Sequence, residues 1–158
     1  WRGTYATIWR NVMPTFIYRA ITNQQILLEN EGRATRDFIF VEDICRGLIL
    51  CALKGEAGEV YNLGSGVETS IAELAKKILQ ISGSDSALKV VPKRNWDTSG
   101  KRFASTEKSK KTIGFMAEIG LQEGLERTIA WTRENQAVIQ GCIEKHKRHL
   151  AYYEREAR

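Results

Sequence analysis

The chain has 158 residues, of which 42% are hydrophobic and 27% charged, and this composition suits a soluble globular domain or a part of a larger one. It contains no apolar run near the roughly 18 residues of a membrane span, and its first residues lack the apolar stretch of a signal peptide. The net charge of +5 favours anionic partners such as nucleotides, nucleic acid or an acidic surface. Because the chain begins at Trp1 rather than Met, we expect a processed start or a fragment of a longer protein.

The amino-terminal quarter predicts one helix and two short strands. Residues 1–10 are expected to be irregular. A helix is expected around Pro14, because proline suits a first helical turn and the apolar residues after it have helical spacing. Short strands are expected at 25–28 and 37–41, with a turn around Gly32 between them. The second strand is mostly apolar, so we expect both of its faces to be covered.

A second helix is expected to open at Glu42 and Asp43, two acids at its positive end. Its helical periodicity predicts a buried apolar face made of Ile44, Leu48, Ile49, Ala52 and Leu53. A strand at 60–63 is expected to follow this helix. The three cysteines, of which two lie in this helix, have no CxxC spacing, so we expect buried free thiols and a cytoplasmic location.

The rest of the chain predicts four helices and one strand. Ser70 and Glu73 have the spacing of a capping box at the start of a helix, and a fourth strand is expected at 88–91. A long irregular segment at 93–105 is typical of a functional or mobile loop. Helices are then expected at 106–112, at 121–133 and in a carboxyl-terminal extension, 134–158, with an apolar stripe.

This order of elements predicts an α/β fold, a small mixed β-sheet with packed helices, in a single domain over residues 1–158. It lacks the regular alternation and glycine-rich first turn of a complete nucleotide-binding domain. The histidines have no metal-binding pattern with a third ligand, so no metal is expected.

Four stretches in register resemble one known family, the extended short-chain dehydrogenases/reductases. The resemblance is to the carboxyl-terminal half of the NAD-dependent nucleotide-sugar epimerases and dehydratases of the UDP-galactose 4-epimerase type, and it covers residues 10–133. The stretches are NVMPTFI, GRATRDFIFVEDICRGLILCAL, GEVYNLGSGVETSIAELAKKI and KSKKTIGFMAEIGLQEGLERTIAW.

The resemblance implies a two-lobed enzyme of which this chain carries the substrate-binding lobe. In the family, the amino-terminal Rossmann lobe holds a glycine-rich dinucleotide turn and a catalytic Tyr-x-x-x-Lys. Neither motif occurs in this sequence. We therefore expect no catalytic residue and no cofactor bound by this chain alone, with NAD(P) implied for the full-length family enzyme.

The resemblance also implies a site for the diphosphate of a sugar nucleotide, which planar guanidinium groups suit. Arg36, in the RDF motif, matches the arginine that binds this diphosphate; the alternative is a surface ion pair with Asp37 or Glu42. Asp37 itself is expected to hold backbone amides at the start of the strand. Arg94, in RNWD, matches a second diphosphate-binding arginine.

Three further residues complete the predicted substrate site. The RNWD motif has Trp96 where the family often has glycine, so Arg102, in the same loop, is the alternative to Arg94. Asn11 matches a diphosphate contact ahead of a helix, with a plain helix cap as the alternative. Leu28 lies on the strand edge that reads the pyrimidine base, mostly through backbone groups.

The predicted function is therefore the sugar-nucleotide-binding lobe of an epimerase or dehydratase, not catalytically competent alone. The alternative is a stand-alone, non-enzymatic binding or interaction protein derived from that lobe. Nucleic-acid binding is disfavoured because the sequence has no recognition motif for it. An exposed surface between lobes, or the stripe on the last helix from Ile139 to Leu150, is expected to favour a homo-oligomer.

Overall fold

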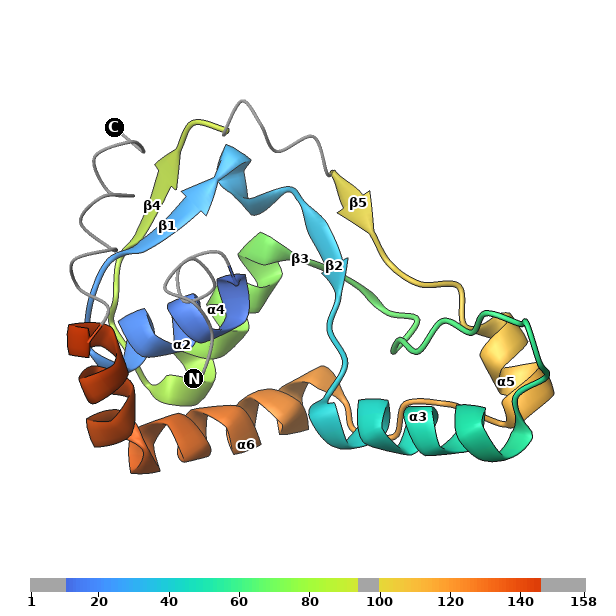
Figure 1. Cartoon of the computed structure of the whole chain (residues 1–158). Helices are drawn as coiled ribbons and strands as arrows, with labels where there is room; N and C mark the ends of the chain where they lie inside the picture. The colour runs from blue at the N-terminus through green and yellow to red at the C-terminus, as the bar shows by residue number, and fades with distance from the viewer. Residues whose placement is uncertain (1–10, 94–99, 146–158) are drawn as a thin grey trace.

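The computed structural model of the protein describes residues 11–93 and 100–145 (Figure 1). The element order is mixed α/β, as the sequence predicts. The elements are α2 (Val12–Ile21), β1 (Ile26–Glu29), η1 (Asn30–Gly32), β2 (Thr35–Asp37), α3 (Val41–Lys54), β3 (Glu68–Ser70), α4 (Ile71–Ser82), β4 (Leu88–Val91), β5 (Lys101–Arg102), α5 (Glu107–Ile113) and α6 (Leu121–Glu134). Residues 136–145 form a further helix.

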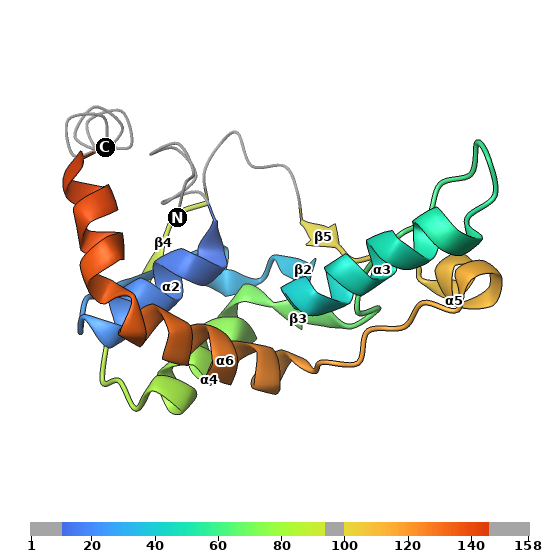
Figure 2. The ribbon, with the colours of Figure 1, turned by 60° about the horizontal axis from the view of Figure 1, so that its bottom comes forward.

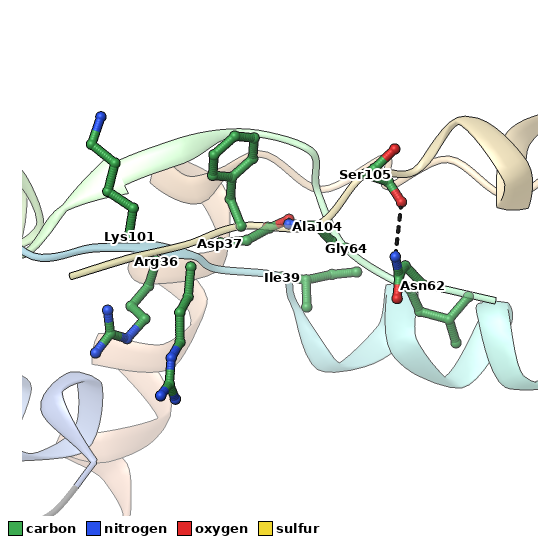
Figure 3. Close-up of a pocket in the computed structure, with 11 residues that line it drawn as sticks. Arg36, Asp37, Ile39, Asn62, Gly64, Lys101, Ala104 and Ser105 are labelled. Atoms are coloured by element: carbon green, nitrogen blue, oxygen red, sulfur yellow. Dashed lines mark hydrogen bonds between the residues drawn. The ribbon is translucent and has the colours of Figure 1, made fainter. Parts of the chain in front are cut away.

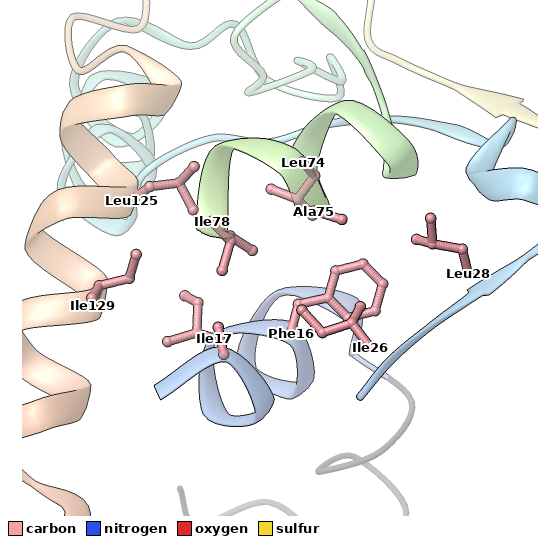
Figure 4. Close-up of a cluster of buried hydrophobic side chains, with 10 residues drawn as sticks. Phe16, Ile17, Ile26, Leu28, Leu74, Ala75, Ile78, Leu125 and Ile129 are labelled. Atoms are coloured by element: carbon pink, nitrogen blue, oxygen red, sulfur yellow. The ribbon is translucent and has the colours of Figure 1, made fainter. Parts of the chain in front are cut away.

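The main core lies between α2, α4, α6 and strand β1 (Figure 4). Each of these elements carries apolar residues at the spacing of its own period, so each presents one apolar side to the others. The core residues are Phe16, Ile17, Ala20, Ile26, Leu28, Leu74, Ala75, Ile78, Leu125 and Ile129. None of them comes from α3 or α5.

The strands form two small sheets in the described residues, where the sequence suggested one. Strands β1 and β4 pair in parallel, with Leu28 opposite Val90. In the other sheet β2 lies in the middle, antiparallel to β3 and parallel to β5. Strand β5 falls in the segment that was expected to be irregular. Its pairing partner lies more than sixty residues away, so local sequence carries no signal for it.

Local signals set the start of α4 and the turn that precedes β2. Ser70 Oγ accepts a hydrogen bond from the Glu73 backbone N–H at 3.1 Å, which confirms the predicted cap. Gly32 has φ +68°, and a Cβ added there would lie 2.7 Å from the Ala72 nitrogen. Only glycine combines this left-handed conformation with so close an approach to α4.

Helices α3 and α5 lie at the end of the molecule away from α2 and α4 (Figures 1 and 2). Their contact is filled by Ile113 and Phe115, which are fully buried, and by Leu63 against Gly47 of α3. Asp43 of α3, only 2% exposed, joins this helix to the segment that leads into α6.

Asp43 holds that segment through three contacts. Its carboxylate accepts hydrogen bonds from the backbone N–H groups of Ile119 (3.0 Å) and Glu118 (3.1 Å) and pairs with Arg46 Nη2 at 2.6 Å. Burial raises the pKa of Asp43, but the hydrogen bonds from Ile119, Arg46 and Glu118 and the Arg46 charge outweigh burial and leave the pKa below its usual 3.8.

Three sequence predictions in this region are wrong. The strand expected at 37–41 is Thr35–Asp37 instead, and residues 38–40 are half-buried and unpaired in the described structure. No strand forms at 60–63. The predicted buried face of α3 is largely exposed, with Leu48, Ile49 and Leu53 between 59% and 76% exposed. In each case the apolar pattern is present, but it is paired with no strand, or, in α3, it is largely exposed in the described chain.

The cysteines are also more exposed than the sequence predicts. All three are free, but Cys45 is exposed and Cys51 and Cys142 are half-buried, so the expectation of buried thiols is wrong. Cys45 lies on the uncovered side of α3. Among the described helices, none is long and apolar enough to cross a membrane.

Candidate functional site

The site begins with the register of two neighbouring strands. Strand β2 pairs in parallel with β5, and this pairing places Arg36 opposite Arg102. Residues directly opposite each other in a sheet point to the same face, on strands about 4.8 Å apart. The two guanidinium groups therefore project from one face of the sheet, and Lys101, one residue before Arg102, points to the other face (Figure 3).

A cavity of about 660 Å³ opens beside these strands (Figure 3). Its walls come from β2, from the segment that follows α3 and from β5 with the residues after it. The lining residues are Arg36, Asp37, Ile39, Asn62, Leu63, Gly64, Lys101, Arg102, Phe103, Ala104 and Ser105. The cavity thus has basic, amide and apolar parts.

Backbone carbonyls orient the Arg36 guanidinium. Arg36 Nη1 donates to the carbonyl oxygens of Thr35, at 2.7 Å, and Gly100, at 3.2 Å. The carboxylates of the alternative ion pair have other partners: Asp37 binds amides, and Glu42 pairs with Arg127 at 3.0 Å. A guanidinium is a planar group with five donors, the geometry that suits an anion with several acceptor oxygens.

Asp37 braces the wall of the cavity, as the sequence suggested. Its carboxylate accepts hydrogen bonds from Ser65 N–H (2.9 Å), Ser65 Oγ (2.5 Å), Gly66 N–H (3.0 Å) and Ala104 N–H (3.4 Å). A Cβ added to Gly64 would lie 2.5 Å from Asp37 Oδ2, so this turn requires glycine. Because Asp37 is engaged by these amides, its charge is compensated locally rather than by the arginines.

Sequence reasoning missed the part of the wall that comes from the segment after α3. Asn62 lines the cavity and donates from Nδ2 to the Ser105 carbonyl at 3.1 Å. This contact joins residues 43 positions apart. The signal in the sequence is the Asn-Leu-Gly-Ser-Gly turn, which by itself indicates a turn and not a ligand site.

Two of the other predicted site residues, Asn11 and Leu28, do not line this cavity. Asn11 is exposed at the N-cap of α2, and its side chain makes no capping hydrogen bond. The Leu28 side chain is 5% exposed and belongs to the core, so only its backbone is left for recognition. Arg94 lies outside the described residues. The structure therefore brings together Arg36 and Arg102 of the five.

Among the described residues that line the cavity, Arg36, Lys101 and Arg102 are cationic and Asp37 is anionic, so the cavity has a net positive charge. Lys101 Nζ lies 3.6 Å from Glu68 Oε1, which partly offsets its charge. In the described residues no cluster of three or more His, Cys, Asp and Glu side chains is placed to hold a metal ion. The arrangement suits an anion with several acceptor oxygens.

Comparison with known proteins relates the chain to the epimerase/dehydratase family. Residues 2–64 match the NAD dependent epimerase/dehydratase family. The homologues of this chain are enzymes of the epimerase/dehydratase family. WbmF of Bordetella bronchiseptica, solved in complex with NAD+ and UDP, is 53% identical with a TM-score of 0.83, over 97% of this chain and 45% of WbmF.

Two further relatives of this epimerase/dehydratase chain are dehydratases. The dTDP-glucose 4,6-dehydratase of Streptomyces niveus is 34% identical over 80% of this chain and 38% of that protein. DesIV, the dTDP-glucose 4,6-dehydratase of Streptomyces venezuelae, was solved with NAD and TYD bound; it is 28% identical with a TM-score of 0.75, over 80% of this chain and 39% of DesIV. The resemblance to the epimerase/dehydratase family is confirmed, and the chain spans less than half the length of each of these relatives.

Proposed function

We propose that this chain binds the diphosphate of a nucleotide sugar, as the substrate-binding lobe of an NAD-dependent epimerase or dehydratase. The observation that carries the proposal is the pairing of Arg36 with Arg102 across β2 and β5, on the wall of one cavity. A diphosphate has about two negative charges and several acceptor oxygens, and two adjacent guanidinium forks match both properties.

The size of the cavity is compatible with a small-molecule ligand. Its volume of about 660 Å³ falls within the roughly 300–1,000 Å³ that is usual for small-molecule sites. Its mixture of cationic, amide and apolar walls suits a phosphate linked to a sugar and a base. The complexes of WbmF with UDP and of DesIV with TYD support a nucleotide as the ligand class.

The remaining predicted contacts stay part of this proposal. Arg94 is proposed to approach the same diphosphate, and Asn11 to contact it from the start of α2. The backbone of β1 around Leu28 is proposed to read the base, since the second edge of β1 has no strand partner in the described residues. A cytoplasmic location fits three free cysteines and a sugar-nucleotide ligand.

The chain alone is proposed to bind substrate without converting it. The sequence has neither the glycine-rich dinucleotide turn nor the Tyr-x-x-x-Lys pair that the family uses. NAD chemistry would therefore come from a part of the family fold that this sequence does not contain. The choice of sugar is proposed to depend also on contacts with that other part of the family fold.

Calorimetric titration of the chain with UDP, UMP, UDP-glucose and dTDP-glucose tests the proposal. We expect sub-millimolar to millimolar binding of the diphosphates and weaker binding of UMP. A hydrogen bond from a charged donor contributes about 1.5–3 kcal/mol, so Arg36→Ala and Arg102→Ala should each weaken UDP binding roughly 10- to 150-fold.

Arg133→Ala is the matched control, because Arg133 donates to the Ser82 carbonyl at 2.6 Å on the surface of α6 and does not line the cavity. This variant should bind UDP as the wild type does. Absence of diphosphate binding at millimolar concentration by the folded chain contradicts the proposal. Equal affinity for UDP in Arg36→Ala, Arg102→Ala and the Arg133→Ala control also contradicts the proposal.

A further inference from the structure

A second, smaller cavity lies at the carboxyl ends of two parallel strands. Strands β1 and β4 run in the same direction and end at the same edge of their sheet (Figure 1). The cavity has a volume of about 150 Å³ and is lined there by Glu29, the last residue of β1, and by Lys93, two residues after β4. In α/β sheets, ligands bind preferentially beyond the carboxyl ends of the strands. The position of this cavity is therefore one that suits a ligand.

The charged side chains of this cavity favour an anion. The described lining contains three cationic side chains and one acidic side chain, which are Arg33, Lys93, Lys101 and Glu29. Arg33 pairs with Glu31 at 2.6 Å, but both side chains are more than half exposed, and ion pairs in solvent contribute little free energy. The lining thus keeps a net positive charge that an anion would offset.

The size of the second cavity limits the kind of anion. Its volume of about 150 Å³ is below the roughly 300–1,000 Å³ of sites for drug-sized ligands. A group of a few atoms fits this space, whereas a whole nucleotide sugar does not. A guanidinium and two ammonium groups are the usual partners of a phosphate or carboxylate, because their N–H groups donate to several oxygens at once.

The backbone around the second cavity is held by elements outside it. The carbonyl oxygen of Gly100 accepts hydrogen bonds from the Thr35 N–H at 3.1 Å and from Arg36 Nη1 at 3.2 Å, and a Cβ added to Gly100 would meet nothing within 4 Å. Asn30 and Glu31, in the turn after β1, have φ of +47° and +58°, which is rare for residues other than glycine. Backbone strain of this kind is often found at ligand sites.

We propose that this second cavity binds a small oxyanion of the phosphate class, independently of the diphosphate in the first cavity. Among their lining residues the two cavities share Lys101 alone. Arg36 and Arg102 project from one face of the β2–β5 pair, and Lys101 points to the other face. The second site therefore depends on Arg33 and Lys93, which the proposed nucleotide site does not use.

Amide NMR titration of the folded chain with inorganic phosphate tests the proposal, with the ionic strength held constant by sodium chloride. The amides of Asn30, Gly32 and Gly100 should show saturable shifts in the millimolar range, while those of Gly64 and Ala104 report on the first cavity. A parallel titration with glucose 1-phosphate distinguishes the two sources of a phosphate group. Tighter binding of this ester to the same amides indicates a phosphate ester as the ligand, and tighter binding of inorganic phosphate indicates the free ion.

Lys93→Gln and Arg33→Gln should each weaken phosphate binding at the second cavity roughly three- to tenfold, because each removes one solvent-exposed cation from its lining. Lys77→Gln is the matched control, since it makes the same change in net charge. Lys77 pairs with Glu73 at 3.9 Å on α4 and lines neither cavity. This control should change the affinity for phosphate by less than about twofold, because salt screens distant charges.

Independence of the two sites has its own readout. Saturating UDP should change the affinity of the second cavity for phosphate by no more than about twofold, and Lys93→Gln should change the affinity for UDP by no more than about twofold. The proposal is overturned if the second-cavity amides show no saturable shift, or if UDP displaces phosphate from them. It is also overturned if Lys93→Gln and Arg33→Gln bind phosphate as Lys77→Gln does. A chain that binds phosphate there but does not bind UDP contradicts only the proposed function, so the two proposals can fail separately.

Discussion

Replacing Asp43 with asparagine tests how α3 is held. Asp43 Oδ1 accepts from Arg46 Nη2 and from the Glu118 N–H, and Oδ2 accepts from the Ile119 N–H. Asparagine has nearly the same shape but only one acceptor oxygen, and its NH₂ group faces donors. At least one buried N–H group therefore loses its partner in Asp43→Asn.

The expected cost follows from these contacts. An unsatisfied buried amide costs about 1–3 kcal/mol, and loss of the pairing with the half-buried Arg46 adds roughly 1 kcal/mol. The sum, about 2–4 kcal/mol, corresponds to roughly 30- to 700-fold faster hydrogen exchange in peptides of α3. Mass spectrometry of exchange at pH 7 measures this directly.

The effect should also depend on pH. Because the pKa of folded Asp43 lies below its usual 3.8, its ionised form contributes stability above about pH 4, and this is lost as the pH falls through the folded pKa. Asp43→Asn has no such titration. The difference in exchange between wild type and variant should therefore shrink as the pH is lowered below about 4.

Glu118→Gln is the control, because Glu118 is 71% exposed and its pairing with Arg46 at 3.0 Å lies on the surface. This change should alter the free energy of opening by less than about 1 kcal/mol. The reasoning fails if Asp43→Asn changes exchange in α3 no more than this control does, or if its effect is the same at pH 3 and pH 7.

The remaining predictions concern the turn, the cap and the cavity wall. Gly32→Ala should destabilise the chain by at least about 1–2 kcal/mol in urea unfolding, because alanine is strained at φ +68° and its Cβ meets Ala72; an unchanged midpoint contradicts this. Ser70→Ala should cost about 1 kcal/mol in the same assay through loss of the cap on α4, whereas Ser70→Asp should retain most of it. Asp37→Asn should speed amide exchange at the Ser65–Gly66 turn and weaken UDP binding, and faster exchange with unchanged affinity would separate the turn from the site.

The sequence predicted the helices and strands whose apolar sides are covered by other elements of the described chain. Helices α2, α4 and α6 and strands β1 and β4 lie within a few residues of their expected positions because they cover one another. Their periodicity and their burial therefore agree. The apolar positions of α4, for example, are the ones that contact α2 and α6 in the core.

The predictions failed where the described chain leaves an apolar pattern exposed. A pattern of apolar residues indicates which side of α3 is built for burial, but not whether a partner is present. For the same reason 60–63 has the composition of a strand without strand pairing. The contacts of Asp37 with Ser65 and Ala104 were also unpredictable in detail, since they join residues 28 and 67 positions apart.

The candidate site was predicted in part. The family resemblance directed attention to Arg36, and the loop sequence suggested Arg102 as an alternative to Arg94. What no local pattern contained was the strand register that sets Arg36 opposite Arg102. That register depends on pairing between segments more than sixty residues apart.

The pairing of two arginines has a consequence for the sheet itself. Like charges directly opposite each other on neighbouring strands repel, and β5 is only two residues long. In the free chain this repulsion opposes the attachment of β5 to β2, and salt weakens it by screening. If the proposed phosphate binds to both arginines, it offsets this repulsion, so phosphate binding and the attachment of β5 to β2 should favour each other. On the proposed function, the attachment of this edge strand should therefore increase with the concentration of the anion.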